Sequence, residues 1–344
     1  MGLAHNSSSE RADCLDQGRS QAALDPAAVM LEPDPQKISP LGLQDLIREL
    51  ATPYPLSDET IEHFQTEGYV KLPRVLSPGA VVALRREIVS VLEADFGVAL
   101  DGGQRDKDMF PEHAAGQAGR RFFSAEMAWL TNPIIRLFVL SPRIAKICTD
   151  LLRVDSVRLY HDNLLSKEPG CGRTPWHYDD HHFPLATNEV VTAWIAAQAI
   201  PEAMGPLAFA KGMETWRQVA DIPFSKVDTS YDQQVAEVFK QSEVDVDESG
   251  FGVGEVSFHH NLSFHTAGGN TTNVSRCALA NTFFASGARV VDAPTMVSGD
   301  WQKFLPGVDP GGVAASPLNP ICWPASPDWA HMPDPYQSEK DNDA

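Results

Sequence analysis

The sequence predicts an α+β protein in which a group of helices precedes a β-rich core. Between residues 57 and 152, apolar side chains recur at helical spacing behind Ser and Pro residues that are typical of helix starts. From residue 156 onward, short apolar runs alternate with Gly, Pro, Asn and Asp, a texture typical of a sandwich or barrel of short strands. At 43% apolar residues, the chain of 344 residues has enough material to fill one large core.

Three helical regions are predicted in the first half. Ser57 and Gly68 bound the first, which leads directly into a short strand, and Ser77 begins the second. The third runs through residues 132–152 and is expected to break at Ser141, because Pro142 follows it. We expect these helices to buttress one face of a sheet.

Six stretches are predicted as strands of the β core. They combine β-branched and aromatic residues with turn signals on both sides. In chain order they are VRLYHDNLLSKE, PWHYDDHHF, VVTAWIAAQ, PLAFAKG, EVSFHHNLSFH and RCALANTFFAS.

The ends of the chain differ from its middle. Residues 1–38 and 333–344 are polar and poor in apolar side chains, so we expect disordered tails around a single domain at 39–332. Within that domain, residues 213–250 form a long, acidic and weakly patterned interruption of the strands. Long loops in compact domains are usually functional, so this segment is a candidate lid insertion.

Charge and cysteine content narrow the class of protein. A formal net charge of −19 disfavours nucleic acid as a partner, since a nucleic-acid surface needs clustered Lys and Arg. The longest nearly apolar run, residues 190–200, is too short for a membrane span. Five widely spaced cysteines without a C-x-x-C pair fit a reducing compartment, and no secretory signal is evident, so a cytoplasmic location is expected. The sequence carries no indication of an oligomeric state.

A metal site is predicted around the motif TPWHYDDHHFPL. On a strand, residues two apart share a face, so His177 and Asp179 are expected to project together. His265 lies at the end of a later predicted strand and can supply a third ligand. Two imidazoles and one carboxylate form the facial triad of non-heme Fe(II) oxygenases. Eleven residues later, Arg276 offers a forked cation that suits a carboxylate.

With these motifs in order, the sequence resembles the phytanoyl-CoA dioxygenase family of Fe(II)/2-oxoglutarate-dependent oxygenases. The resemblance runs from about residue 58 to 325 and is carried by IEHFQTEGYVKLP, RTPWHYDD, TAWIAA and SFHTAGGNTTNVSRCAL. It implies a double-stranded β-helix, a jelly-roll or cupin-like core, with the N-terminal helices packed outside. Family members often have Ser two residues after the distal His, where this chain has Ala267.

The resemblance also implies roles for individual residues. His177, Asp179 and His265 would hold Fe(II), Arg276 would anchor 2-oxoglutarate, and Trp194 would line the cosubstrate pocket. The implied reaction oxidises a C–H bond of a small organic substrate with O2, most simply by hydroxylation, and releases succinate and CO2. Related halogenases lack the carboxylate that Asp179 supplies, so halogenation is not expected.

Other readings stay open at this point. A zinc hydrolase could use the same His, Asp and His, and a non-catalytic β-barrel could bind a small molecule there. We expect His259 and His260 to be ordinary surface or core histidines, and Lys167 to be a solvated charge at a strand end. Asp180, His181 and His182 are expected beside the pocket or on a solvated rim.

Overall fold

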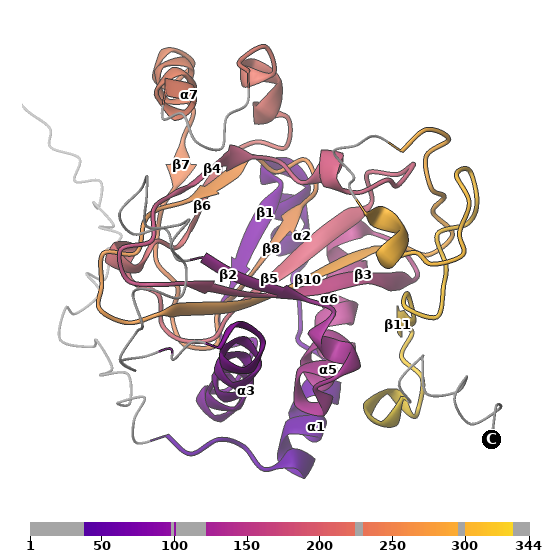
Figure 1. Ribbon diagram of the computed structural model, residues 1–344. Coiled ribbons are helices and arrows are strands. Elements are labelled where there is room, and N and C mark those ends of the chain that lie inside the picture. The colour runs from indigo at the N-terminus through magenta and orange to yellow at the C-terminus, as the bar shows by residue number, and fades with distance from the viewer. Residues whose placement is uncertain (1–37, 98–99, 101–121, 224–229, 295–299, 333–344) are drawn as a thin grey trace, which may run out of the picture. The chain divides into compact units, whose positions relative to one another are not determined.

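A computed structural model describes residues 38–97, 100, 122–223, 230–294 and 300–332 (Figure 1). The predicted tails lie outside this part of the chain, apart from residue 38. The single domain predicted at 39–332 stays a prediction. The α-helices described are α1 (Leu43–Ala51), α2 (Asp58–Glu67), α3 (Pro78–Phe96), α5 (Pro133–Val139), α6 (Pro142–Leu152) and α7 (Ser230–Gln241).

The predicted helix signals act as expected. Ser57 and Ser77 accept hydrogen bonds from the main-chain N–H groups three residues on, and Gly68 ends α2 in a left-handed conformation. The third region is two helices, because the hydroxyl of Ser141 caps a new helix at Pro142. Helix α1 was not predicted.

The strands form two antiparallel sheets, as expected for a jelly-roll core. The larger sheet has the order β1-β8-β5-β10-β3-β11, with β2 also paired to β3, and the smaller has the order β4-β9-β6-β7. Their bounds are β1 (Tyr69–Leu72), β2 (Phe122–Glu126), β3 (Val157–Lys167), β4 (Thr174–His177), β5 (Val190–Ala196), β6 (Leu207–Ala210), β7 (Val246–Asp247), β8 (Val256–His260), β9 (His265–Ala267), β10 (Arg276–Ala285) and β11 (Ile321–Trp323).

Two strand predictions need correction. The stretch PWHYDDHHF is a strand only as far as His177, after which the chain turns into a 3₁₀ helix over Asp180–His182. The stretch EVSFHHNLSFH is two strands, β8 and β9, which belong to different sheets. The turn between them therefore carries the chain from one sheet to the other. Strands β2, β7 and β11 were not predicted.

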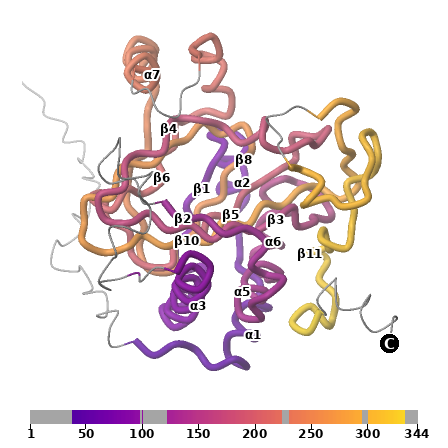
Figure 2. The backbone as a smooth tube through the Cα atoms, viewed as in Figure 1, coloured from indigo at the N-terminus to yellow at the C-terminus, as the bar shows by residue number. Residues whose placement is uncertain are grey.

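The helices cover one face of the larger sheet, as Figures 1 and 2 show for α3, α5 and α6. Fully buried side chains such as Leu84, Ile147 and Phe283 join these helices to strands β3, β5, β8 and β10 in one apolar core. Burial of this apolar area stabilises the sheet from behind. Its other face is left to form the floor of the site.

Candidate active site

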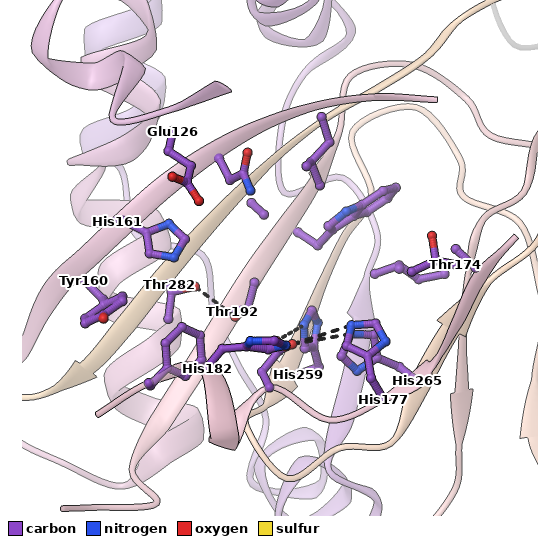
Figure 3. Close-up of a pocket in the computed structure, with 18 of the residues that line it drawn as sticks. Glu126, Tyr160, His161, Thr174, His177, His182, Thr192, His259, His265 and Thr282 are labelled. Carbon is purple, nitrogen blue, oxygen red and sulfur yellow. Dashed lines mark hydrogen bonds and ion pairs between the residues drawn. The ribbon is translucent and has the colours of Figure 1, made fainter. Parts of the chain in front are cut away.

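Three side chains bring their donor atoms together between the two sheets. His177 ends β4, His265 begins β9, and Asp179 follows two residues after His177. The Oδ1 atom of Asp179 lies 3.7 Å from Nε2 of His177 and 3.9 Å from Nε2 of His265. All three donor atoms lie within 4.8 Å of one another (Figure 3). The structure thus brings together the three residues that the sequence predicted as ligands.

Strand alternation is not what aligns His177 with Asp179. The strand stops at His177, and Asp179 has helical backbone angles, φ −87° and ψ −16°. The turn is held because the N–H groups of Asp179 and Asp180 both donate to the carbonyl of Asn261, which follows β8. His177 and His265 are direct partners in the β4–β9 pairing, and that pairing sets their separation.

Both imidazoles are oriented by main-chain carbonyls. Nδ1 of His177 lies 2.8 Å from the carbonyl oxygen of Pro175, and Nδ1 of His265 lies 2.9 Å from that of Ser263. A carbonyl oxygen only accepts, so each Nδ1 carries the proton and donates it. Each Nε2 then keeps its lone pair toward Asp179, which is the tautomer that a metal ion needs.

A third histidine supports the carboxylate from the far side. His259 on β8 is buried, and its Nε2 lies 3.4 Å from Oδ2 of Asp179. It therefore contacts the oxygen that does not face His177 and His265. The sequence predicts an ordinary core or surface histidine at this position. The signal that could have revealed its role is the face of the strand on which it lies. Its direct partner on the neighbouring strand β5 is Thr192, whose side chain lines the same cavity.

The electrostatics favour deprotonated ligands. Burial acts to raise the pKa of Asp179, but His265, His259 and His177 together lower it well below its usual range. Burial, reinforced by His177, lowers the pKa of His265 well below its usual range. The carboxylate is thus charged and this imidazole neutral at neutral pH.

The donor set fits a divalent metal ion. Adjacent ligands about 2.1 Å from an octahedral ion are about 3.0 Å apart, and opposite ligands about 4.2 Å apart. The ligands of a facial set are all adjacent, so the separations of 3.7 and 3.9 Å must shorten by about 0.7–0.9 Å, which small rotations of the side chains can supply. Two imidazoles and one carboxylate leave half of an octahedron for other ligands.

Arg276 is a buried cation that lacks a carboxylate partner among the residues described. It is 2% exposed, and one terminal nitrogen donates to the carbonyl oxygen of Gly205 at 2.7 Å. Its Nε is buried with no hydrogen-bond partner in the described chain. Gly205 has φ +70°, and a Cβ there would clash with the Gly268 carbonyl, so glycine is required to present this acceptor.

Trp194 contacts Arg276 and lines the same cavity as the triad. The guanidinium carbon of Arg276 is 5.3 Å from the centre of the Trp194 ring, a cation–π contact. Trp194 is two residues from Thr192 on β5, and Thr192 pairs with His259 on β8. Trp194 pairs with Ala280 on β10, so only a small side chain stands beside Trp194 on the floor of the cavity.

Lys167 is not the solvated charge that the sequence suggested. It is 1% exposed and pairs with Arg276 across β3 and β10. Its ammonium donates to the carbonyl oxygen of Gly268 at 2.7 Å and to Oγ1 of Thr174 at 3.1 Å. Burial, with Arg276 adding to it, lowers the pKa of Lys167 to about 7.

The other charged or imidazole residues of the TPWHYDDHHFPL motif, and His260 on β8, each have a different environment. Asp180 accepts a hydrogen bond from the side-chain amide of Asn261 at 2.8 Å, which braces the turn that carries Asp179. His181 packs edge-on against Tyr178, and His182 lines the cavity. His260 is buried and, unlike His259, does not line the cavity.

A cavity of about 570 Å³ opens above these groups. Side chains of both sheets line it, among them His177, Asp179, His265, Arg276 and Trp194. Ala267, where the family often has Ser, also lines it. This volume lies in the range of small-molecule sites.

The described part of the candidate lid packs behind β4. Helix α7 donates from the Tyr231 hydroxyl to the carbonyl oxygen of Trp176, and its Asp232 accepts from the Trp176 N–H. None of residues 213–223 and 230–250 lines the cavity. The lid role stays a prediction, and this segment also supports the strand that carries His177.

Two further features concern location. No helix in the described ranges is long and apolar enough to cross a membrane. Cys148, Cys171, Cys277 and Cys322 are buried, and none of these four is in a disulfide. The cytoplasmic compartment stays a prediction.

Comparison with known proteins agrees with this geometry. The structure is similar to SnoK, described as a non-heme alpha ketoglutarate dependent carbocyclase from nogalamycin biosynthesis, with 26% identity, a TM-score of 0.61 and coverage of 78% of this chain and 99% of SnoK. Its fold is also similar to that of the epimerase SnoN from nogalamycin biosynthesis (21%, TM-score 0.57, 77% and 98%) and of EctD from S. alaskensis (17%, 0.54, 83% and 92%). A search of curated proteins found no match.

The family comparison covers the site itself. The family model described as phytanoyl-CoA dioxygenase matches residues 64–278, more than half of the chain. This range contains His177, Asp179, His265 and Arg276. The chain therefore belongs to the phytanoyl-CoA dioxygenase family of Fe(II)/2-oxoglutarate-dependent oxygenases.

Proposed function

We propose that this protein uses Fe(II), 2-oxoglutarate and O2 to oxidise a C–H bond of a small organic metabolite, with release of succinate and CO2. The observation that carries the proposal is the pairing of two sites in one cavity. One is a His-Asp-His cluster with both imidazoles fixed in the metal-binding tautomer. The other is a buried guanidinium that has no carboxylate partner in the described chain.

Each residue has one part in this proposal. His177, Asp179 and His265 hold Fe(II), which when bound supplies the activation of O2 and the oxidation of 2-oxoglutarate. Arg276 binds the carboxylate of 2-oxoglutarate farthest from the metal, and Trp194 forms the wall between them. His259 holds the second oxygen of Asp179, so that Oδ1 stays directed toward the two imidazoles.

The solved relatives support the choice of cosubstrate. SnoN has been solved with Fe3+ and alpha ketoglutarate, and EctD with 2-oxoglutarate. The two alternatives from the sequence are not supported, because the family is one of dioxygenases.

Consumption of 2-oxoglutarate tests the proposal. We expect purified protein to form succinate from 2-oxoglutarate in air only when Fe(II) is added. Asp179→Ala should abolish succinate formation, and the neighbouring variant Asp180→Ala should retain it in part, since Asp180 braces the turn without facing the other ligands. Equal turnover by wild type and Asp179→Ala would overturn the assignment.

A further inference from the structure

The part of the cavity beyond the triad has aromatic walls. Tyr160, His161, Phe183 and Phe304 all line it. The rings of His161 and Phe304 are stacked, with centres 4.5 Å apart at 26°. Tyr160 meets Phe183 edge-on with centres 5.1 Å apart, and its ring is tilted at 46° to that of Phe304 with centres 5.4 Å apart. Four rings therefore surround one end of the cavity.

These rings lie away from the end that holds Arg276. In the larger sheet, His161 on β3 pairs with Thr282 on β10, Thr282 with Thr192 on β5, and Thr192 with His259 on β8. His161 and His259 thus stand at opposite ends of one row across the floor, with Asp179 beside His259 (Figure 3). Arg276 is six residues from Thr282 along β10, about 20 Å of strand. A molecule against the rings would reach the metal site without entering the arginine end.

Apart from the charged side chains of Glu126, Asp300 and Lys303, the described polar groups near these rings are uncharged. Nδ1 of His161 lies 3.3 Å from its neighbour's carbonyl oxygen, while its other ring nitrogen has no hydrogen-bond partner among described residues. Burial lowers the pKa of His161, so the ring is neutral at neutral pH. The hydroxyls of Thr192 and Thr282 lie 3.1 Å apart on the floor. These groups suit a hydroxyl or carbonyl oxygen.

The rim does not suit a phosphate. Lys303 is paired with Glu126 at 2.7 Å, and Asp300 adds a second carboxylate at the same edge. Apart from Arg276 at the far end, Lys303 is the one Lys or Arg among the cavity-lining residues that the structure describes. A coenzyme A ester carries several phosphate charges that would lack cationic partners among the described residues of this rim.

We propose that the substrate is an uncharged molecule with a planar aromatic ring and a phenolic or carbonyl oxygen, seated against Phe304, Phe183 and His161. This inference rests on the proposed function and names the substrate class of the same site. Ring stacking supplies the recognition, and His161 binds the oxygen. The described rim, with two carboxylates and one ammonium, disfavours acyl-coenzyme A thioesters.

Binding to the anaerobic protein loaded with Fe(II) and 2-oxoglutarate tests the inference. Isothermal titration calorimetry would compare 1-naphthol with decahydro-1-naphthol, which has the same skeleton and hydroxyl but no aromatic ring, and with palmitoyl-coenzyme A. We expect 1-naphthol to bind about tenfold or more tightly than its saturated analogue, and palmitoyl-coenzyme A not to bind. Phe304→Leu and Phe183→Leu should each weaken 1-naphthol binding about three- to tenfold.

The matched control is Phe138→Leu, which also removes a buried ring but lies in the core behind the sheet. It should leave 1-naphthol binding unchanged. Equal affinity for the saturated analogue, or tight binding of palmitoyl-coenzyme A, would overturn the inference. The heat of 2-oxoglutarate binding to the Fe(II) protein is recorded first. If it is absent while 1-naphthol still binds selectively, the proposed function fails and the ring-binding site stands.

Discussion

Replacing Arg276 with methionine separates cosubstrate binding from stability. Burial lowers the pKa of Arg276 to about 10, against an ordinary value of 12.5. That shift corresponds to about 3 kcal/mol of destabilisation of the charged side chain in the folded protein. The side chain has no compensating carboxylate in the described residues, and Lys167 is its neighbour across the strands.

The contacts that Arg276 does make offset this cost. Its hydrogen bond to Gly205 is worth about 1.5–3 kcal/mol as a bond from a charged group, and its contact with Trp194 up to about 2 kcal/mol. The cost of burying the charge and the gain from these two contacts nearly cancel. We therefore expect Arg276→Met to change the free energy of unfolding of the ligand-free protein by less than about 2 kcal/mol.

Cosubstrate binding should respond very differently. Removing one member of a buried, hydrogen-bonded charge pair costs about 2–5 kcal/mol, so the dissociation constant of 2-oxoglutarate should rise about 30-fold or more. The assay is anaerobic calorimetric titration of the Fe(II) protein with 2-oxoglutarate, with urea unfolding of the ligand-free protein beside it. Arg158→Met is the matched control, since Arg158 on β3 also donates to a main-chain carbonyl, that of Asn319, but does not line the cavity.

Two results would refute this reasoning. Unchanged 2-oxoglutarate affinity in Arg276→Met would show that the anchor lies elsewhere. A loss of several kcal/mol of stability in the ligand-free variant would show that Arg276 is mainly structural.

Three further predictions follow from other contacts of the site. His259→Phe should weaken Fe(II) binding about 10- to 100-fold by releasing Asp179, while His260→Phe, its buried neighbour outside the cavity, should not; equal effects would contradict the assigned contact. Burial lowers the pKa of Lys167 to about 7, so the unfolded chain binds more protons between about pH 7 and 10.5, and stability gains from this residue as pH rises through that window. In wild type the free energy of unfolding should rise by up to about 1.4 kcal/mol per pH unit in this window, and this rise should be absent in Lys167→Met. Urea unfolding at several pH values measures it, and the same pH dependence in both proteins would contradict the lowered pKa of Lys167. Deleting Ser230–Gln241 should lower iron content, because α7 holds both main-chain groups of Trp176 beside His177; unchanged iron content would leave the segment free to act only as a lid.

The sequence predicted the metal set because it depends on residue type and order. His177, Asp179, His265 and Arg276 are specific in combination, and no detail of the backbone was needed to name them. The prediction that strand alternation aligns His177 with Asp179 was wrong, however. The turn after His177 depends on hydrogen bonds to Asn261, 82 residues away from Asp179, and such a long-range contact leaves no local pattern.

The same limit explains the supporting residues. His259 and Lys167 could not be assigned because their roles depend on which strands become neighbours. A lysine at a strand end is usually solvated, and only the pairing of β3 with β10 places Lys167 beside Arg276. Helix α7 was not predicted, and its cover of Trp176 is a tertiary contact that leaves no local pattern.

The most direct test of the central claim is a visible absorption spectrum recorded without oxygen. Fe(II) and then 2-oxoglutarate are added to the purified protein, and wild type is compared with Asp179→Ala and Arg276→Ala. Chelation of iron by a 2-oxo acid gives a weak charge-transfer band, so we predict a band that appears in wild type only after both additions and is lost or much reduced in each variant. No band in wild type, or an equal band in Asp179→Ala, would contradict the assignment of His177, Asp179 and His265 as the iron site.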